Sequence, residues 1–202
     1  MRGLLLSLLL GAAAPALAQS AAPAPDSVAR PWYRPHHVML QTASGAGVVA
    51  GGVGFAGRHD RLETDILVGY VPEKLAGSAL SIATAKVLYT PYTVPLSNKL
   101  QLRPLTVGLY LSYTHGTIND EEPFQYTKGY YWFSTDTRVG ILLGGRLSYL
   151  APRTATPGRP RRVSAYYELG THDLYLASYI PNTKAMNFTD ILTLGLGLKM
   201  DL

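Results

Sequence analysis

The chain has 202 residues, of which 15% are charged, and a formal net charge of +5. Soluble domains usually carry roughly 25% charged residues, so this chain is poor in charge for a soluble protein. The basic residues are scattered, which excludes a nucleic-acid-binding stripe, and the absence of cysteine excludes disulfides, thiol catalysis and thiolate metal sites.

The first 18 residues have the three parts of a cleavable secretory signal. Arg2 supplies a positive charge, residues 3–14 form an apolar run, and a small-x-small site ends at Ala18. The apolar run is shorter than the roughly 20 residues that a membrane-spanning helix needs. We therefore expect export and cleavage after Ala18, followed by a flexible Ala- and Pro-rich leader over 19–35 and one domain over 36–202.

The rest of the chain divides into about eight segments in which apolar and polar residues alternate. A period of two is typical of strands with one apolar face. In 80–89, Lys86 stands where the apolar face should continue, which predicts either a β-bulge or the opposite register. We expect the seventh strand to continue, with a register break, through 173–179. The segments are about 38–44, 48–56, 62–70, 80–89, 105–113, 138–149, 163–172 and 190–202.

In the last segment, alternate leucines and one methionine form an apolar face that continues to Leu202. Such a strand fits the lipid-facing wall of a membrane barrel. The predicted fold is therefore all-β, an antiparallel up-and-down transmembrane β-barrel of about eight strands. Both chain ends would be periplasmic, with the connections 115–136 and 180–189 outside and the turns 57–61, 92–98 and 151–162 inside.

The polar faces of these segments carry acids and bases in equal number. Side chains just fill the interior of an eight-stranded barrel. A charge buried there costs several kcal/mol unless it is paired. We therefore predict a closed lumen crossed by ion pairs. The six candidate residues are Glu63, Asp65, Glu168, Arg138, Arg146 and Lys199.

No cofactor or metal site is predicted. Residues 52–57 match the G-x-G-x-x-G pattern of dinucleotide-binding proteins, but here the pattern joins two strands instead of a strand and a helix. His36 and His37 are adjacent, so they would point to opposite sides of a strand and could not share a metal ion.

The export signal, the alternating segments, the lack of cysteine and the terminal strand together resemble the small outer-membrane β-barrel proteins of Gram-negative bacteria, the class of OmpA-, OmpX- and OmpW-like barrels. The resemblance covers about 38–202 and is architectural. It implies an outer-membrane location, contact with outer-membrane lipid, and folding by the outer-membrane assembly machinery. Leu202 departs from the class, whose members usually end in an aromatic residue. The implied role is structural, adhesive or small-ligand binding, with no chemistry evident.

A second interpretation is enzymatic. The sequence around His115, with Thr117 and Asn119, is similar to the His-x-Ser-Asn element of outer-membrane lipid A deacylases. The resemblance implies an acyl hydrolase in which His115 is the general base and Glu168 the orienting acid. Thr117 replaces the serine nucleophile, and Asn119 is displaced by one position.

A third interpretation is a soluble lipocalin-like barrel with its apolar face turned inward around a ligand. Alternation alone fits this arrangement and a membrane barrel equally well. The aromatic residues of the longest connection are expected to form an outer girdle or a surface for an unknown extracellular ligand or protein partner. They are Tyr130, Tyr131, Trp132 and Phe133.

Overall fold

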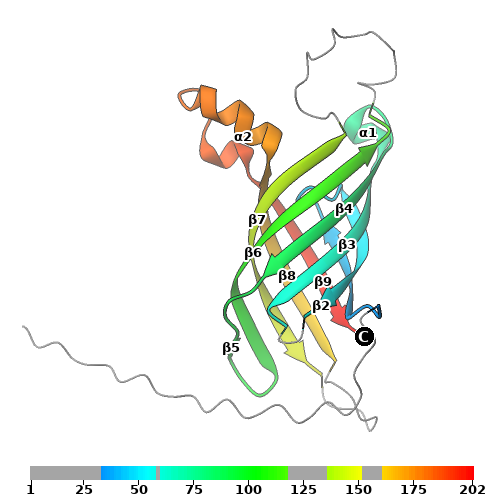
Figure 1. Cartoon of the computed structure of the whole chain (residues 1–202), viewed down its shortest axis with the longest axis vertical. Helices are drawn as coiled ribbons and strands as arrows, with labels where there is room; N and C mark the ends of the chain where they lie inside the picture. Colours follow the sequence, from blue (N-terminus) through cyan, green and yellow to red (C-terminus); the bar gives the residue numbers. More distant parts are fainter. Residues whose placement is uncertain (1–32, 58–59, 118–135, 152–160) are drawn as a thin grey trace, which may run out of the picture.

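The computed structural model describes residues 33–57, 60–117, 136–151 and 161–202, which form a closed β-barrel (Figure 1). Each wall strand pairs antiparallel with its neighbours, β1 pairs with β9, and the predicted eight-stranded up-and-down barrel is confirmed. A two-residue strand, β5 (Val94–Pro95), adds only to the edge of β6. The wall strands are β1 (His37–Thr42), β2 (Val49–Ala56), β3 (Leu62–Val71), β4 (Leu80–Tyr89), β6 (Leu100–His115), β7 (Thr137–Leu150), β8 (Arg162–His172) and β9 (Thr193–Asp201).

The connections alternate between two ends of the barrel. The terminal end carries the C-terminus and the connections 57–61 and 90–99 (Figure 1). The helical end carries α1 (Glu73–Ala76) and, between β8 and β9, α2 (Asp173–Tyr179), η2 (Ile180–Asn182) and η3 (Phe188–Ile191). No helix in the described part of the chain is long and apolar enough to cross a membrane.

Residues 173–179 were expected to extend β8, and this prediction is wrong because they form α2. The pairing of β8 with β7 ends at His172, and the leucines and alanine that follow it are good helix formers.

β4 pairs regularly with β3 on one side and with β6 on the other. Of the two alternatives predicted for 80–89, the opposite register is therefore confirmed and the bulge is wrong. Lys86 faces inward, while Ala85 and Val87 face outward. The described register shift lies in β6, between Arg103 and Thr106. Pro104 sits in this interval and has no N–H to donate to a ladder, which is why a bulge falls there.

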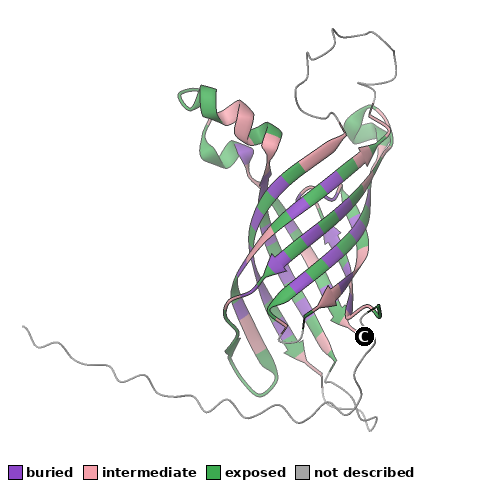
Figure 2. Ribbon diagram, in the orientation of Figure 1, coloured by how far each residue is buried: buried purple, intermediate pink, exposed green. Residues whose placement is uncertain are grey.

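Buried and exposed residues alternate along the wall strands (Figure 2). The exposed residues include many large apolar side chains, and most of the buried ones are polar or charged. On β3, Ile66 and Val68 are 51% and 66% exposed, whereas Glu63 and Asp65 are 3% and 1% exposed. This arrangement contradicts the lipocalin-like alternative, which places the apolar face inside. Every wall strand contributes to the exterior face, which we call the apolar belt: Leu40, Val49, Ile66, Val87, Leu109, Ile141, Leu169 and Leu196.

Candidate functional site

Glu63 on β3 is the centre of an ion-pair network inside the barrel. Its carboxylate accepts hydrogen bonds from Arg103 at 2.8 Å, Arg146 at 2.6 Å and Lys199 at 3.0 Å. These cations come from β6, β7 and β9, so one acid joins four strands. All four side chains are buried, and the three donors supply the pairing that a buried carboxylate requires.

Asp65 extends this network to β1. Lys199 Nζ donates to Asp65 Oδ2 at 2.6 Å, and His37 Nε2 lies 2.8 Å from Asp65 Oδ1. His37, Glu63 and Asp65 each offer a ligand atom within 4.8 Å of the others, the geometry of a potential metal site. The ammonium group of Lys199 contacts both carboxylates, so the chain itself supplies a cation to this cluster.

A second group of interior residues is built around Lys86 on β4. Lys86 Nζ donates to Glu168 at 2.5 Å and to Gln41 at 2.6 Å. The Tyr166 hydroxyl donates to the same Gln41 oxygen at 3.0 Å, and Lys199 Nζ lies 5.3 Å from the centre of the Tyr166 ring. This cation–π contact joins the second group to the network around Glu63.

At the terminal end, Arg162 at the start of β8 forms two ion pairs. Its guanidinium donates to Asp201 on β9 at 2.7 Å and to Asp60 in the turn after β2 at 2.8 Å. One cation therefore ties β8 to its neighbour β9 and, beyond β9 and β1 in the sheet order, to the turn between β2 and β3.

The connection 43–48 between β1 and β2 folds into the barrel at the helical end, and we call it the plug loop. Ser44 and Ala46 are 0% exposed although they belong to a connection. Gly45 contacts the Tyr110 ring on β6, and its carbonyl accepts a hydrogen bond from Thr84 on β4 at 3.2 Å. The plug loop therefore reaches across the barrel from β1 and β2 to the neighbouring strands β4 and β6.

Glycines in the wall make room for the plug loop. A Cβ atom on Gly69 of β3 would collide with the carbonyl oxygen of Ala46, and one on Gly195 of β9 would lie 2.6 Å from Ser44 Cβ. The chain uses glycine at these positions because backbone must approach backbone closely.

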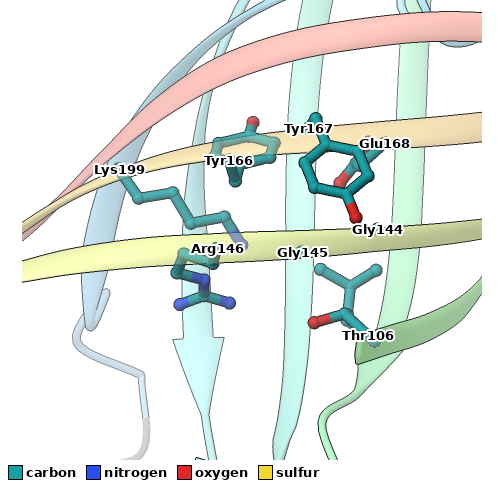
Figure 3. Close-up of a pocket in the computed structure, with 9 residues that line it drawn as sticks. Thr106, Gly144, Gly145, Arg146, Tyr166, Tyr167, Glu168 and Lys199 are labelled. Carbon is teal, nitrogen blue, oxygen red and sulfur yellow. The ribbon is translucent and has the colours of Figure 1, made fainter. Parts of the chain in front are cut away.

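Little free space remains between the charged side chains. A pocket bordered by Arg146, Tyr166, Glu168 and Lys199 has room for about one water molecule (Figure 3). In Figure 3, the Lys199 side chain extends toward Arg146 and passes beside the Tyr166 ring. The space among these four side chains is therefore too small for a large ligand.

The structure places five of the six predicted interior residues in these networks: Glu63, Asp65, Arg146, Glu168 and Lys199. Arg138 instead lies half-buried at the helical end, where it donates to the Thr137 carbonyl at 2.9 Å.

Sequence reasoning missed the interior residues His37, Gln41, Lys86 and Arg103 as members of the network. Lys86 gave a signal, because it interrupts an apparent apolar face. Arg103 gave none: it shares odd numbering with the outward-facing Leu105 and Leu109, and only the bulge at Pro104 turns it inward.

The residues of the hydrolase interpretation do not come together. His115 is exposed at the helical end of β6, and Thr117 donates to Asp136 at 3.0 Å. Glu168 pairs with Gly144 on β7, and Gly144 pairs with Thr106 on β6. Thr106 lies nine residues from His115 along β6. This spacing corresponds to roughly 30 Å at about 3.3 Å per residue. Glu168 is also held by Lys86, so it cannot orient His115.

The predicted signal, most of the leader, and the aromatic residues Tyr130, Tyr131, Trp132 and Phe133 lie outside the described residues.

Comparisons of the chain with protein-family models, curated proteins and solved structures found no match. The eight-stranded antiparallel barrel fits the class of small outer-membrane barrels in its architecture.

Proposed function

We propose that the protein is an integral outer-membrane β-barrel with a structural role, in which a closed, charge-paired interior holds the wall together. The observation that carries this proposal is the apolar belt, which surrounds a barrel whose buried interior is charged. A soluble protein of this size rarely exposes a contiguous apolar patch larger than a few hundred Å². A bilayer removes the belt from water, and the closed sheet satisfies the backbone hydrogen bonds that lipid cannot.

Exposed tyrosines at both margins of the belt support the same proposal. Tyr70 and Tyr113 lie toward the helical end, and Tyr89 and Tyr149 toward the terminal end. Tyrosine is favoured at membrane interfaces because its ring is apolar and its hydroxyl is polar.

The register gives the spacing of these two tyrosine groups. Tyr89 pairs with Leu62, eight residues from Tyr70 on β3, whereas Tyr113 pairs with Thr137, twelve residues from Tyr149 on β7. At about 3.3 Å per residue and a tilt of about 40°, these intervals correspond to roughly 20 and 30 Å of depth. They bracket the apolar height of about 25 Å that is typical of outer-membrane barrels.

The helical end would face outward and the terminal end the periplasm. Outer-membrane barrels carry their longer connections outside, and the connections 116–136 and 173–192 both leave the helical end.

Cell fractionation tests the proposal directly. We expect the protein in the outer-membrane fraction after a high-salt wash, with an unheated form that migrates faster than the boiled form on a detergent gel. Recovery from the soluble periplasmic fraction, or identical migration of the two forms, would refute it.

The filled interior leads to a separate prediction about the ion conductance of the purified protein in planar bilayers. Because side chains and the plug loop occupy the barrel, we expect no steady ion conductance. Stable single-channel steps would show that the barrel inserts but is not closed.

A further inference from the structure

The segment Asp173–Ile191, which we call the helical arm, connects β8 to β9 at the helical end. In Figure 1 it extends to the side of the barrel and does not cross the mouth. Within the arm, α2 contacts β7, β8, η2 and η3. The arm therefore projects from the helical end next to β7 and β8.

The helical arm exposes large apolar side chains. Ile180 is 72% exposed, Phe188 55%, Leu174 40% and Tyr175 39%. Neither α2 nor η2 contains a buried residue. In Figure 2 the arm is drawn almost entirely as exposed and intermediate residues. Removing these side chains from water would be favourable.

The arm is nevertheless held in a defined shape. Tyr179 and Phe188 make an edge-to-face contact with ring centres 6.0 Å apart, which brings the outgoing and returning parts together. Asn187 and Asp190 form a reciprocal capping box at the start of η3, and Ile191 is 0% exposed. The apolar side chains are thus presented by a folded unit.

The arm joins the wall close to an outward-facing pair of leucines. The last outward-facing pair of β8 and β9 before the arm is Leu169 and Leu194, which are register partners and 39% and 53% exposed. The arm begins four residues after Leu169 and ends three residues before Leu194. Any lipid or protein that covers Leu169 and Leu194 would therefore also lie next to the arm.

We propose that the helical arm lies on the external leaflet, with Ile180 and Phe188 among the lipid acyl chains. This inference rests on the proposed membrane location. It adds that the barrel contacts lipid beyond its wall through a helical segment in the interface. Lipid is favoured over a second copy or another protein because the arm leaves the barrel sideways from the margin of the belt.

The test uses single-cysteine variants, which the cysteine-free chain allows without other changes. Ile180→Cys reports on the arm, Leu194→Cys on the belt, and Glu73→Cys on α1, a helix at the same end of the barrel. Each variant is labelled with an environment-sensitive dye and placed, one copy per disc, in phosphatidylcholine nanodiscs. Emission is then quenched either by a nitroxide on the lipid chain or by aqueous iodide, after gel migration has shown that the barrel is folded.

We expect the dyes at positions 180 and 194 to emit at shorter wavelength and to lose most of their emission to the lipid-borne quencher, while the dye at position 73 responds to iodide. If the dye at position 194 is quenched from the lipid but the dye at position 180 is quenched by iodide, like the one at position 73, the proposed lipid contact of the arm is wrong. The proposed membrane location of the barrel is then still supported. If position 194 is itself quenched by iodide, the proposed function fails, and the arm fails with it. One copy per disc excludes a second protein as the cover.

Discussion

The two halves of the barrel interior are filled in opposite ways. Toward the terminal end, charged side chains from several strands meet at Glu63 and Asp65. Toward the helical end, the plug loop packs its backbone against Gly69 and against the Tyr110 ring. The terminal half requires that charged groups be present to pair with one another. The helical half requires that a side chain be absent at Gly69, where the plug loop packs. A substitution that is harmless in one half can therefore be severe in the other.

The largest effect is expected from Glu63→Leu. This change leaves Arg103, Arg146 and Lys199 without their shared acceptor, and breaking a buried ion pair typically costs about 3–5 kcal/mol. Urea unfolding of the barrel in detergent, followed by gel migration, measures the loss. Glu73→Leu on the exposed α1 is the matched control and should change stability by less than about 0.5 kcal/mol. Equal midpoints for the two variants would mean that the charged half does not hold the wall.

A smaller but still clear effect is expected from Gly69→Ala. The added methyl group would strike the Ala46 carbonyl oxygen, so the plug loop or the wall must move, and such overpacking costs about 1–3 kcal/mol. Gly51→Ala is the control, because a Cβ there meets only the Met39 carbonyl oxygen at 3.9 Å. The same unfolding assay compares them. A Gly69→Ala variant as stable as Gly51→Ala would show that the plug loop is not packed against β3.

Thr84→Val removes the hydrogen bond from the Thr84 hydroxyl to the Gly45 carbonyl while keeping the side-chain shape. We expect a loss of about 0.5–1.5 kcal/mol. Faster hydrogen exchange of the plug-loop amides, with the amides around Glu63 unchanged, would place the effect in the helical half. Exchange that rises equally in both halves would contradict the separation of the two.

The smallest expected quantity is the coupling between the halves. Glu63 and Gly69 lie six residues apart on β3, roughly 20 Å at about 3.3 Å per residue. Effects at that distance with no shared partner usually add to within about 0.5 kcal/mol. A double-mutant cycle with Glu63→Leu and Gly69→Ala measures the coupling. A coupling of 1 kcal/mol or more, on the order expected for residues in contact, would mean that the interior is one unit.

Alternation in the sequence predicted the fold and the inward direction of Glu63, Asp65 and Glu168, because a period of two is a local property of a strand. It could not predict that Glu63 meets Lys199, since that contact depends on how β3 and β9 are placed across the barrel. Arg103 was missed because a single bulge reverses the alternation before Leu105.

The plug loop was missed for a different reason. Its sequence, Ser-Gly-Ala-Gly over 44–47, is that of an ordinary turn, and the glycines that receive it look like those of any strand. Close backbone approach between distant segments leaves no pattern within either segment. The same limit applied to 173–179, where three-dimensional context ended β8 at His172 and an arm replaced the expected strand.

Lys199 has a consequence for the order in which the barrel is completed. It lies on the last strand of the chain, yet its ammonium group contacts acids on β3, which is made early. A shift of β9 by one residue would turn Lys199 to the apolar exterior and leave Asp65 with only His37. The charge on the final strand therefore distinguishes the correct seam between β1 and β9 from a register shifted by one residue, which would lose these interior pairs.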